Sequence, residues 1–279
     1  SLSKIFGAID RFSEDVDLSI ERGMFGYAQN NSPEQAPSKK KQQSILDRLA
    51  RDCSNFVQTT MMADLHEAIC AKIGTAEGWK LYVDQEDPDL QTLLFAYPSK
   101  IAANGYIRQL VKIEIGARAE HWPVGMYPIQ SYAKNALQEK IHEPEMFVRV
   151  LNAERTFWEK ATILHQYAHL PEGKKPPPRI SRHFYDFYRL LNSPIKEQAL
   201  LSSSLLDRVA IHKSIYFASG WANYGMARQG TLKLVPPMII QKELEKDYIL
   251  MESMFFKEIP DWNSIISAIE QFEHEFNQN

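Results

Sequence analysis

The segment Ser13-Glu14-Asp15-Val16-Asp17-Leu18 predicts a strand with two acidic side chains on one face. Residues two apart in an extended chain point to the same side, so Asp15 and Asp17 project together. Two carboxylates this close repel each other unless a cation lies between them. A divalent ion such as Mg²⁺ or Mn²⁺ binds carboxylate oxygens and completes its shell with water and phosphate oxygens. The two aspartates are therefore candidate metal ligands, and the alternative is solvated charge at the end of a strand.

A later segment, residues 106–118, predicts a second strand with an acid on its polar side. Apolar residues alternate there with polar ones that include Glu114. If this strand lies beside the strand at 13–20, Glu114 completes a set of three carboxylates for one or two metal ions. One ion would bind a triphosphate, and the other would activate an acceptor hydroxyl.

The pattern of the whole chain predicts an α+β fold, with a mixed sheet and flanking helices followed by an all-helical carboxyl-terminal half. We expect strands at 13–20, 79–83, 92–97 and 106–118, and helices at 1–9, 45–73, 131–140, 154–169, 180–191, 195–218, 240–256 and 262–276. Polar residues predict a loop at 26–44, and prolines predict a turn near 123–128. The expected domains are an α/β domain over 1–125 and a helical domain over 126–279.

Composition excludes several classes of protein. The 279 residues contain no apolar run near the roughly 18 residues of a membrane helix, and no signal-peptide pattern opens the sequence. We therefore expect a cytoplasmic protein without membrane contact. Its two cysteines, Cys53 and Cys70, form no disulfide framework. The net charge of −3 lacks the positive excess of a general nucleic-acid binder, so contact with RNA would have to be local.

Several segments follow one another in a recognisable order. They are LSK (2–4), RFSEDVDL (11–18), KIEIGAR (112–118), RTFWEKATILH (155–165), SRHFYDFYRLL (181–191), and KDY (246–248) with Met251. Together they resemble the nucleotidyltransferase AbiEii/AbiGii toxin family of the polymerase-β-like nucleotidyltransferase superfamily. The resemblance implies a nucleotidyltransferase-like fold and metal-dependent transfer of a nucleoside monophosphate from a nucleoside triphosphate to an acceptor such as tRNA. It also implies a toxin of a bacterial type IV toxin–antitoxin or abortive-infection system, active in phage defence. The genetically linked antitoxin need not contact it.

The resemblance also assigns roles to individual residues. Metal ligands are Asp15, Asp17 and, from the strand alternation, Glu114; nucleotide or phosphate contacts are Ser13, Arg155, Lys160 and Arg182; a second essential acid is Asp186. Independently of the family, an acid inside the aromatic run 184–188 needs a cationic or hydrogen-bonding partner, which Lys160 or one of the two arginines can supply. A structural ion pair between helices would have the same pattern.

The sequence departs from the family pattern at its start. In the family, a strand and a glycine-rich turn precede the LSK segment and offer backbone N–H groups to the triphosphate. This sequence begins at Ser1, so we expect the chain as it stands to lack that part of the nucleotide site. Either the sequence is truncated at this point or the protein has lost part of its nucleotide site. Two alternatives to the toxin enzyme stay open, and the missing turn favours the first of them. One is a degenerate nucleotidyltransferase-fold protein that binds nucleotide or a partner without catalysis. The other is a nucleotidyltransferase that modifies a small molecule.

Overall fold

The chain folds into two compact units. The computed structural model describes residues 2–13, 15–74, 78–98, 110–136 and 144–278. The sheet unit comprises residues 14–121, and the helical unit comprises residues 1–13 together with 122–279. This division differs from the expected domains, 1–125 and 126–279, chiefly in the place of the first thirteen residues, which associate with the helical unit.

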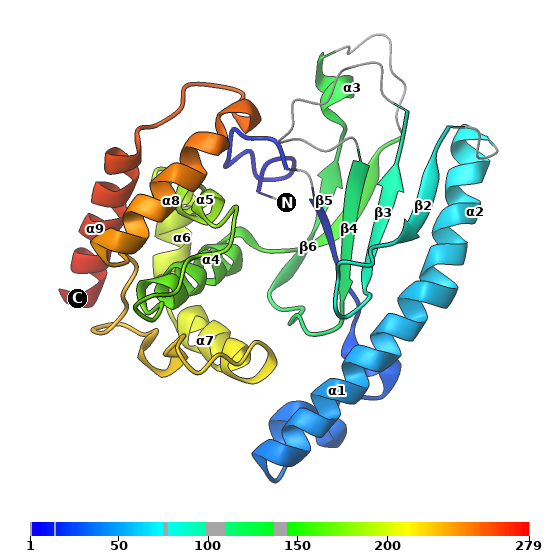
Figure 1. The fold of residues 1–279 in the computed structure, drawn as a ribbon, viewed down its shortest axis with the longest axis horizontal. Coiled ribbons are helices and arrows are strands. Elements are labelled where there is room, and N and C mark those ends of the chain that lie inside the picture. The colour runs from blue at the N-terminus through cyan, green and yellow to red at the C-terminus, as the bar shows by residue number, and fades with distance from the viewer. Residues whose placement is uncertain (1, 14, 75–77, 99–109, 137–143, 279) are drawn as a thin grey trace. The chain divides into compact units, whose positions relative to one another are not determined.

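The sheet unit contains a mixed four-stranded sheet. Its strands are β1 (Asp15–Ser19), β2 (Lys80–Val83), β3 (Thr92–Ala96) and β4 (Leu110–Gly116). The order across the sheet is β1-β4-β3-β2, in which β1 runs parallel to β4 and the other neighbours are antiparallel (Figure 1). The first strand and the acidic strand are thus neighbours, which is the condition under which Glu114 shares a face with the two aspartates.

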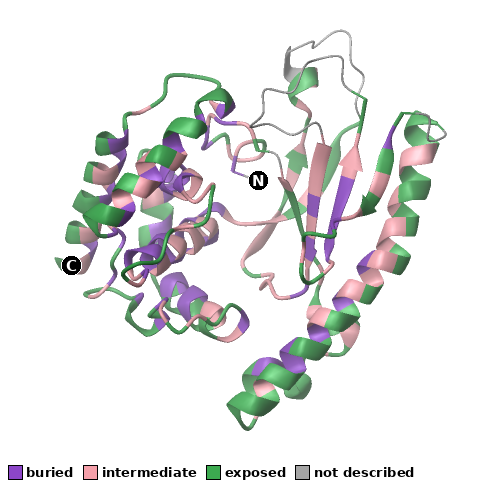
Figure 2. Cartoon of the chain, in the orientation of Figure 1, coloured by how far each residue is buried: buried purple, intermediate pink, exposed green. Residues whose placement is uncertain are grey.

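One face of this sheet is apolar and is covered by a long helical segment. Leu93, Ile113 and Ile115 are buried on that face. The side-chain amide of Gln91 donates to the backbone oxygen of Ala50 at 2.9 Å and so ties the sheet to the helix. Because strand residues alternate between faces, burial of the apolar residues leaves the polar residues of β1 and β4 on the opposite face. Within the sheet unit, Figure 2 shows buried residues on the central strands and along α1 (Lys39–Phe56).

The helical segment consists of α1 (Lys39–Phe56), a π-helical turn (Val57–Met61) and α2 (Met62–Ile73). It ends at Gly74, whose φ of 86° lies in the left-handed region that glycine adopts without strain. The loop predicted over 26–44 is wrong at its end, because the helix already begins at Lys39. Ser38 explains the early start, since its hydroxyl accepts from the backbone N–H of Lys41 at 3.2 Å and caps the helix. Residues 22–35 form short 3₁₀ turns rather than an open loop.

The helical unit is built around an aromatic core. Its helices in the described part of the chain are α3 (Tyr132–Ala136), α4 (Ala153–Ala168), α5 (Ser181–Leu191), α6 (Ile195–Leu201), α7 (Ser204–Tyr216), α8 (Met238–Leu250) and α9 (Trp262–Gln278). Phe157 on α4 contacts the rings of Phe187 and Phe272, and all three side chains are buried. None of the described helices combines the length and apolar composition needed to span a lipid bilayer.

Several expectations for this unit were wrong. The helix expected over 195–218 is interrupted by a turn at Ser202 and Ser203, between α6 and α7, and the helix expected over 240–256 ends at Leu250. Residues 123–128 are not a turn, because β5 (Val124–Ile129) pairs antiparallel with β6 (Met146–Leu151). Pro128 is tolerated because a two-stranded ribbon has outer edges where no N–H is needed. The helix expected over 1–9 is wrong for the residues that the structure describes, 2–9. A single turn over residues 2–6 is closed at Gly7, whose φ is 58°.

Candidate functional site

The polar face of the sheet unit carries the predicted carboxylates. In the parallel pairing of β1 with β4, Asp17 lies opposite Glu114, and Asp15 lies opposite Lys112. Side chains at paired positions of neighbouring strands share a face, so all four project to the same side. Asp17 is exposed, and the Glu114 side chain retains 41% of its exposure. The acids predicted from two distant segments thus lie on one solvent-accessible surface.

Lys112 is a cation of this face that the sequence analysis did not single out, and it lies next to the predicted carboxylates. Its Nζ donates to Oε1 of Glu114 at 2.5 Å, within the same strand. Partial burial disfavours the charged ammonium, yet the pKa of Lys112 is raised because the hydrogen bond and charge of Glu114 outweigh burial. The carboxylates of Asp15 and Asp84 raise that pKa further. The ammonium therefore lies in the field of several acids.

The chemistry of this face suits a hard divalent cation. Mg²⁺ in proteins is commonly held by one or two carboxylates, and its remaining ligands are waters and substrate phosphates. Asp15 and Asp17 supply such a pair from one side of β1. Among the described residues, no three acidic, histidine or cysteine side chains are already gathered as a metal-binding set. Glu114 is directed to Lys112 instead.

The helical unit contains a second, buried cluster around Asp186. Arg11 donates from Nε to Oδ1 of Asp186 and from Nη2 to Oδ2, both at 2.8 Å. Lys160 on α4 donates to Oδ2 at 2.7 Å and to Nδ1 of His183 at 3.0 Å. Asp186 on α5 is fully buried, and Arg11 is 5% exposed. Of the three cations that the sequence left open as partners of Asp186, Lys160 bonds to it, and Arg11, which was not among them, bonds to it as well.

The charges of this cluster depend on one another. Burial raises the pKa of Asp186, but Arg11 and Lys160 hold it well below its usual range. Burial lowers the pKa of Lys160, and the negative charge of Asp186 opposes that effect. Burial and the charge of Lys160 keep the pKa of His183 well below its ordinary value, so the neutral imidazole accepts a hydrogen bond from the ammonium of Lys160. The ammonium is thus held in a fixed direction by two acceptors.

The remaining predicted residues have different surroundings. Arg155 is fully buried and donates to the backbone oxygen of Trp122 at 2.6 Å and to Glu159 at 3.1 Å. These contacts indicate that Arg155 stabilises α4. Its contact with phosphate stays a prediction. Arg182 is partly exposed on α5, close enough for its charge to lower the pKa of Lys160. Ser13 is exposed at the end of the first segment of the helical unit.

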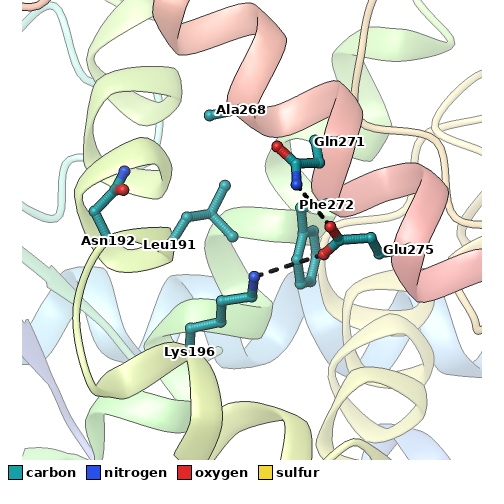
Figure 3. Close-up of a pocket in the computed structure, with 7 residues that line it drawn as sticks. All are labelled: Leu191, Asn192, Lys196, Ala268, Gln271, Phe272 and Glu275. Carbon is teal, nitrogen blue, oxygen red and sulfur yellow. Dashed lines mark hydrogen bonds and ion pairs between the residues drawn. The ribbon is translucent and has the colours of Figure 1, made fainter.

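A pocket of the helical unit lies apart from these residues, beside α5, α6 and α9 (Figure 3). Its volume is about 110 Å³, whereas sites for nucleotide-sized ligands range from roughly 300 to 1,000 Å³. Lys196 and Glu275 approach each other across it at 3.7 Å, and Gln271 donates to Glu275 at 2.7 Å. The ion pair joins α6 to α9, whereas Gln271 and Glu275 both lie on α9. This pocket is too small for a nucleotide.

Comparison with known proteins gives three findings. The model of a family described as nucleotidyl transferase AbiEii toxin, type IV TA system, matches residues 1–275. The solved structure of MenT4, a nucleotidyltransferase toxin from Mycobacterium tuberculosis H37Rv, is similar with 15% sequence identity and a TM-score of 0.42. That match covers 100% of this chain and 80% of the other. Among curated proteins, no relative matches the sequence.

Proposed function

Because the chain belongs to the AbiEii nucleotidyltransferase toxin family, we propose that it transfers a nucleoside monophosphate from a nucleoside triphosphate to tRNA and releases pyrophosphate. The observation that carries this proposal is the register of β1 and β4, which brings Asp15, Asp17 and Glu114 to one accessible face. Family membership implies a nucleotide substrate and an antitoxin partner. We also propose that the acceptor is the 3′ end of tRNA.

In the sheet unit, the three carboxylates would hold Mg²⁺ or Mn²⁺. Bound there, the ion supplies positive charge to the phosphate oxygens and lowers the pKa of an acceptor hydroxyl. Asp15 and Asp17 orient their oxygens together because they are two residues apart on one strand. Glu114 joins them from the neighbouring strand. Its side chain is bonded to Lys112 and must leave that ammonium to do so.

In the helical unit, Lys160 would neutralise charge on the triphosphate. Transfer of a phosphoryl group depends mainly on positioning and on electrostatic stabilisation of the phosphate oxygens. Asp186 is fully buried, so we assign it to holding the ammonium of Lys160 in place rather than to contact with substrate. Arg182 and Ser13 are accessible enough to add contacts to phosphate. Both assignments are part of the proposal.

The test is transfer of label from each of the four nucleoside triphosphates to total RNA in the presence of Mg²⁺. We expect the wild-type chain to label tRNA in the presence of Mg²⁺ and not when EDTA chelates the metal. Asp17→Asn removes one charge from an exposed side chain and should reduce labelling by roughly 10²–10³-fold without unfolding the protein. Labelling that persists at the wild-type rate in Asp17→Asn would rule out the assigned carboxylates.

The same assay separates the alternatives. Label on an aminoglycoside or another small molecule, with none on RNA, would identify a small-molecule nucleotidyltransferase. Nucleotide binding without transfer to any acceptor would identify a degenerate binding protein. Calorimetry with a non-hydrolysable triphosphate analogue detects that binding directly. Each of these outcomes contradicts the proposed transfer to tRNA.

A further inference from the structure

Lys112 lies among the carboxylates that we assign to the metal. Its Nζ is 2.5 Å from Oε1 of Glu114. Its cross-strand neighbour is Asp15, on the same face of the sheet. The side chains of Lys112 and Glu114 keep 36% and 41% of their exposure, so both can change partners without unpacking a core.

An ammonium group and a divalent ion compete for the same carboxylate oxygens. Each is attracted by the negative charge, and each repels the other at the few ångströms that separate ligands of one site. The hydrogen bond from Lys112 occupies one oxygen of Glu114 and fixes the direction of its carboxylate. A metal ion that used Glu114 would therefore have to displace the lysine.

We propose that Lys112 is a built-in counter-ion that competes with the divalent metal for Glu114 and thereby weakens the binding of the free ion. This inference rests on the proposed function, because it concerns the same metal site. Lys112 is assigned as a positioning residue for Glu114. In the absence of metal it stabilises the acidic face, and on metal binding its ammonium is released from the carboxylate.

The expected effect follows from the charges. Repulsion between one ammonium and a divalent ion a few ångströms apart in a water-like dielectric corresponds to roughly a tenfold change in binding constant. Lys112→Met removes the charge and keeps an unbranched side chain of similar length. We therefore expect Lys112→Met to bind Mn²⁺ roughly tenfold more tightly than the wild-type chain. Lys112→Arg keeps the charge and should bind within about twofold of wild type.

Titration calorimetry of the metal-free full chain with Mn²⁺ measures this difference. The matched control is Lys80→Met, which removes the same charge from the same face of the sheet. Lys80 on β2 is exposed and aligns with Ala96 and then Leu110, well away from Glu114 along β4. The Mn²⁺ affinity of Lys80→Met should stay within about twofold of wild type, because exposed charges beyond about 10 Å are largely screened at 0.1 M salt.

Thermal unfolding in EDTA gives a second readout that does not depend on turnover. Lys112→Met should unfold at a lower temperature than Lys80→Met without metal, because its acidic face has lost the counter-ion. Saturating Mn²⁺ should raise its unfolding temperature by more than it raises that of wild type. If Lys112→Met does not fold, Lys112→Gln serves the same titration.

The outcomes separate this inference from the proposed function. Tighter Mn²⁺ binding by Lys112→Met, together with lost binding by Asp17→Asn, supports both. Equal or weaker binding by Lys112→Met, with binding still lost in Asp17→Asn, overturns the inference and leaves the metal site standing. If neither the wild-type chain nor any variant binds Mn²⁺, the metal site itself is wrong and the inference falls with it.

Discussion

The molecule neutralises acidic side chains in two different ways. Asp186 in the helical unit is fully buried, and Arg11 and Lys160 bond to both of its oxygens within 2.8 Å. Glu114 in the sheet unit keeps 41% of its side-chain exposure and bonds to Lys112, which is itself partly exposed. The first arrangement, which we call the closed cluster, buries the carboxylate of Asp186 but leaves the Lys160 side chain 15% exposed, so it holds that lysine in place. The second is accessible, so that an ion from solution can exchange with the lysine.

The largest effect should come from removing charge at the closed cluster. Asp186→Asn leaves Arg11 and Lys160 buried beside a neutral amide, and breaking a buried ion pair in this way costs about 3–5 kcal/mol of unfolding free energy. Urea unfolding of Asp186→Asn and Asp17→Asn measures the contrast, since both substitutions neutralise one aspartate. Equal destabilisation by the two would contradict the distinction between a closed and an open cluster.

The open cluster should show the reverse pattern. Asp17→Asn should reduce the rate of nucleotide transfer by roughly 10²–10³-fold, the usual size for loss of one electrostatic group at a reacting phosphate or acyl centre. Its unfolding free energy should change by less than about 0.5 kcal/mol, because Asp17 is exposed. Initial rates of label transfer measure the first quantity. Asp89→Asn neutralises another acid of the sheet unit and should keep the wild-type rate.

Acid should weaken the helical unit before the sheet unit. His165 is fully buried, its Nδ1 accepts from the backbone of Lys233 at 3.1 Å, and burial lowers its pKa to about 4. Unfolded histidine binds a proton below about pH 6.5. The unfolded state therefore binds more protons between pH 6.5 and 4, and stability falls as the pH falls. His183, whose pKa is also lowered, acts in the same direction.

For His165 alone, the loss between pH 7 and pH 5 should be about 2 kcal/mol. In the sheet unit, Asp87 has a lowered pKa because hydrogen bonds from Thr92 and its neighbours outweigh burial, so its contribution is lost only below about pH 4. Hydrogen exchange at pH 7 and pH 5, corrected for intrinsic rates, should show greater opening of α4 than of β3 in acid. Unchanged protection of α4 would show that these histidines do not control its stability.

The smallest effect concerns a partly exposed pair beside the closed cluster. Asp10 accepts from Arg189 at 2.7 Å and lies 2.9 Å from Lys257, whose side chain is 72% exposed. Arg189→Ala should cost at most about 1 kcal/mol, since exposed ion pairs contribute little. Asp10 and Arg11 are adjacent in the sequence, and each bonds to a residue of α5. The urea midpoints of Arg189→Ala and Arg11→Ala therefore compare the exposed ion pair with the buried one. If Arg189→Ala lost more unfolding free energy than Arg11→Ala, burial would not be what determines the contributions of these two ion pairs.

Local patterns allowed much of the sheet and most helices to be predicted from the sequence. Alternation in VKIEIG and the spacing of two aspartates are properties of adjacent residues, and they gave the polar side of each strand. That the two strands are neighbours, which brings Asp15, Asp17 and Glu114 to one face, came only from the structure. The strand β5 was missed because Pro123 and Pro128 argue against a strand, and its partner β6 was missed with it. Only their mutual pairing, a non-local contact, stabilises them as a ribbon.

The clusters were less predictable because they depend on distant partners and on side-chain conformation. Asp186 called for a cation, and Lys160 was among the three candidates considered. Arg11 was not, since its partner lies 175 residues away in the sequence. Lys112 is one of the polar residues in the alternating segment VKIEIG, so its face could be predicted. Its bond to Glu114 depends on how two flexible side chains turn, which no sequence pattern specifies.

The interrupted path of the helical unit has a consequence for synthesis on the ribosome. The sheet unit is continuous in sequence and can fold as soon as it has left the exit tunnel. Residues 2–13 must wait for α5, because Arg11 meets Asp186 only after 175 further residues have been made. At about 5–20 residues per second, that delay lasts roughly 10–35 s. The nascent chain would thus carry its acidic strand well before the segment that precedes it is anchored.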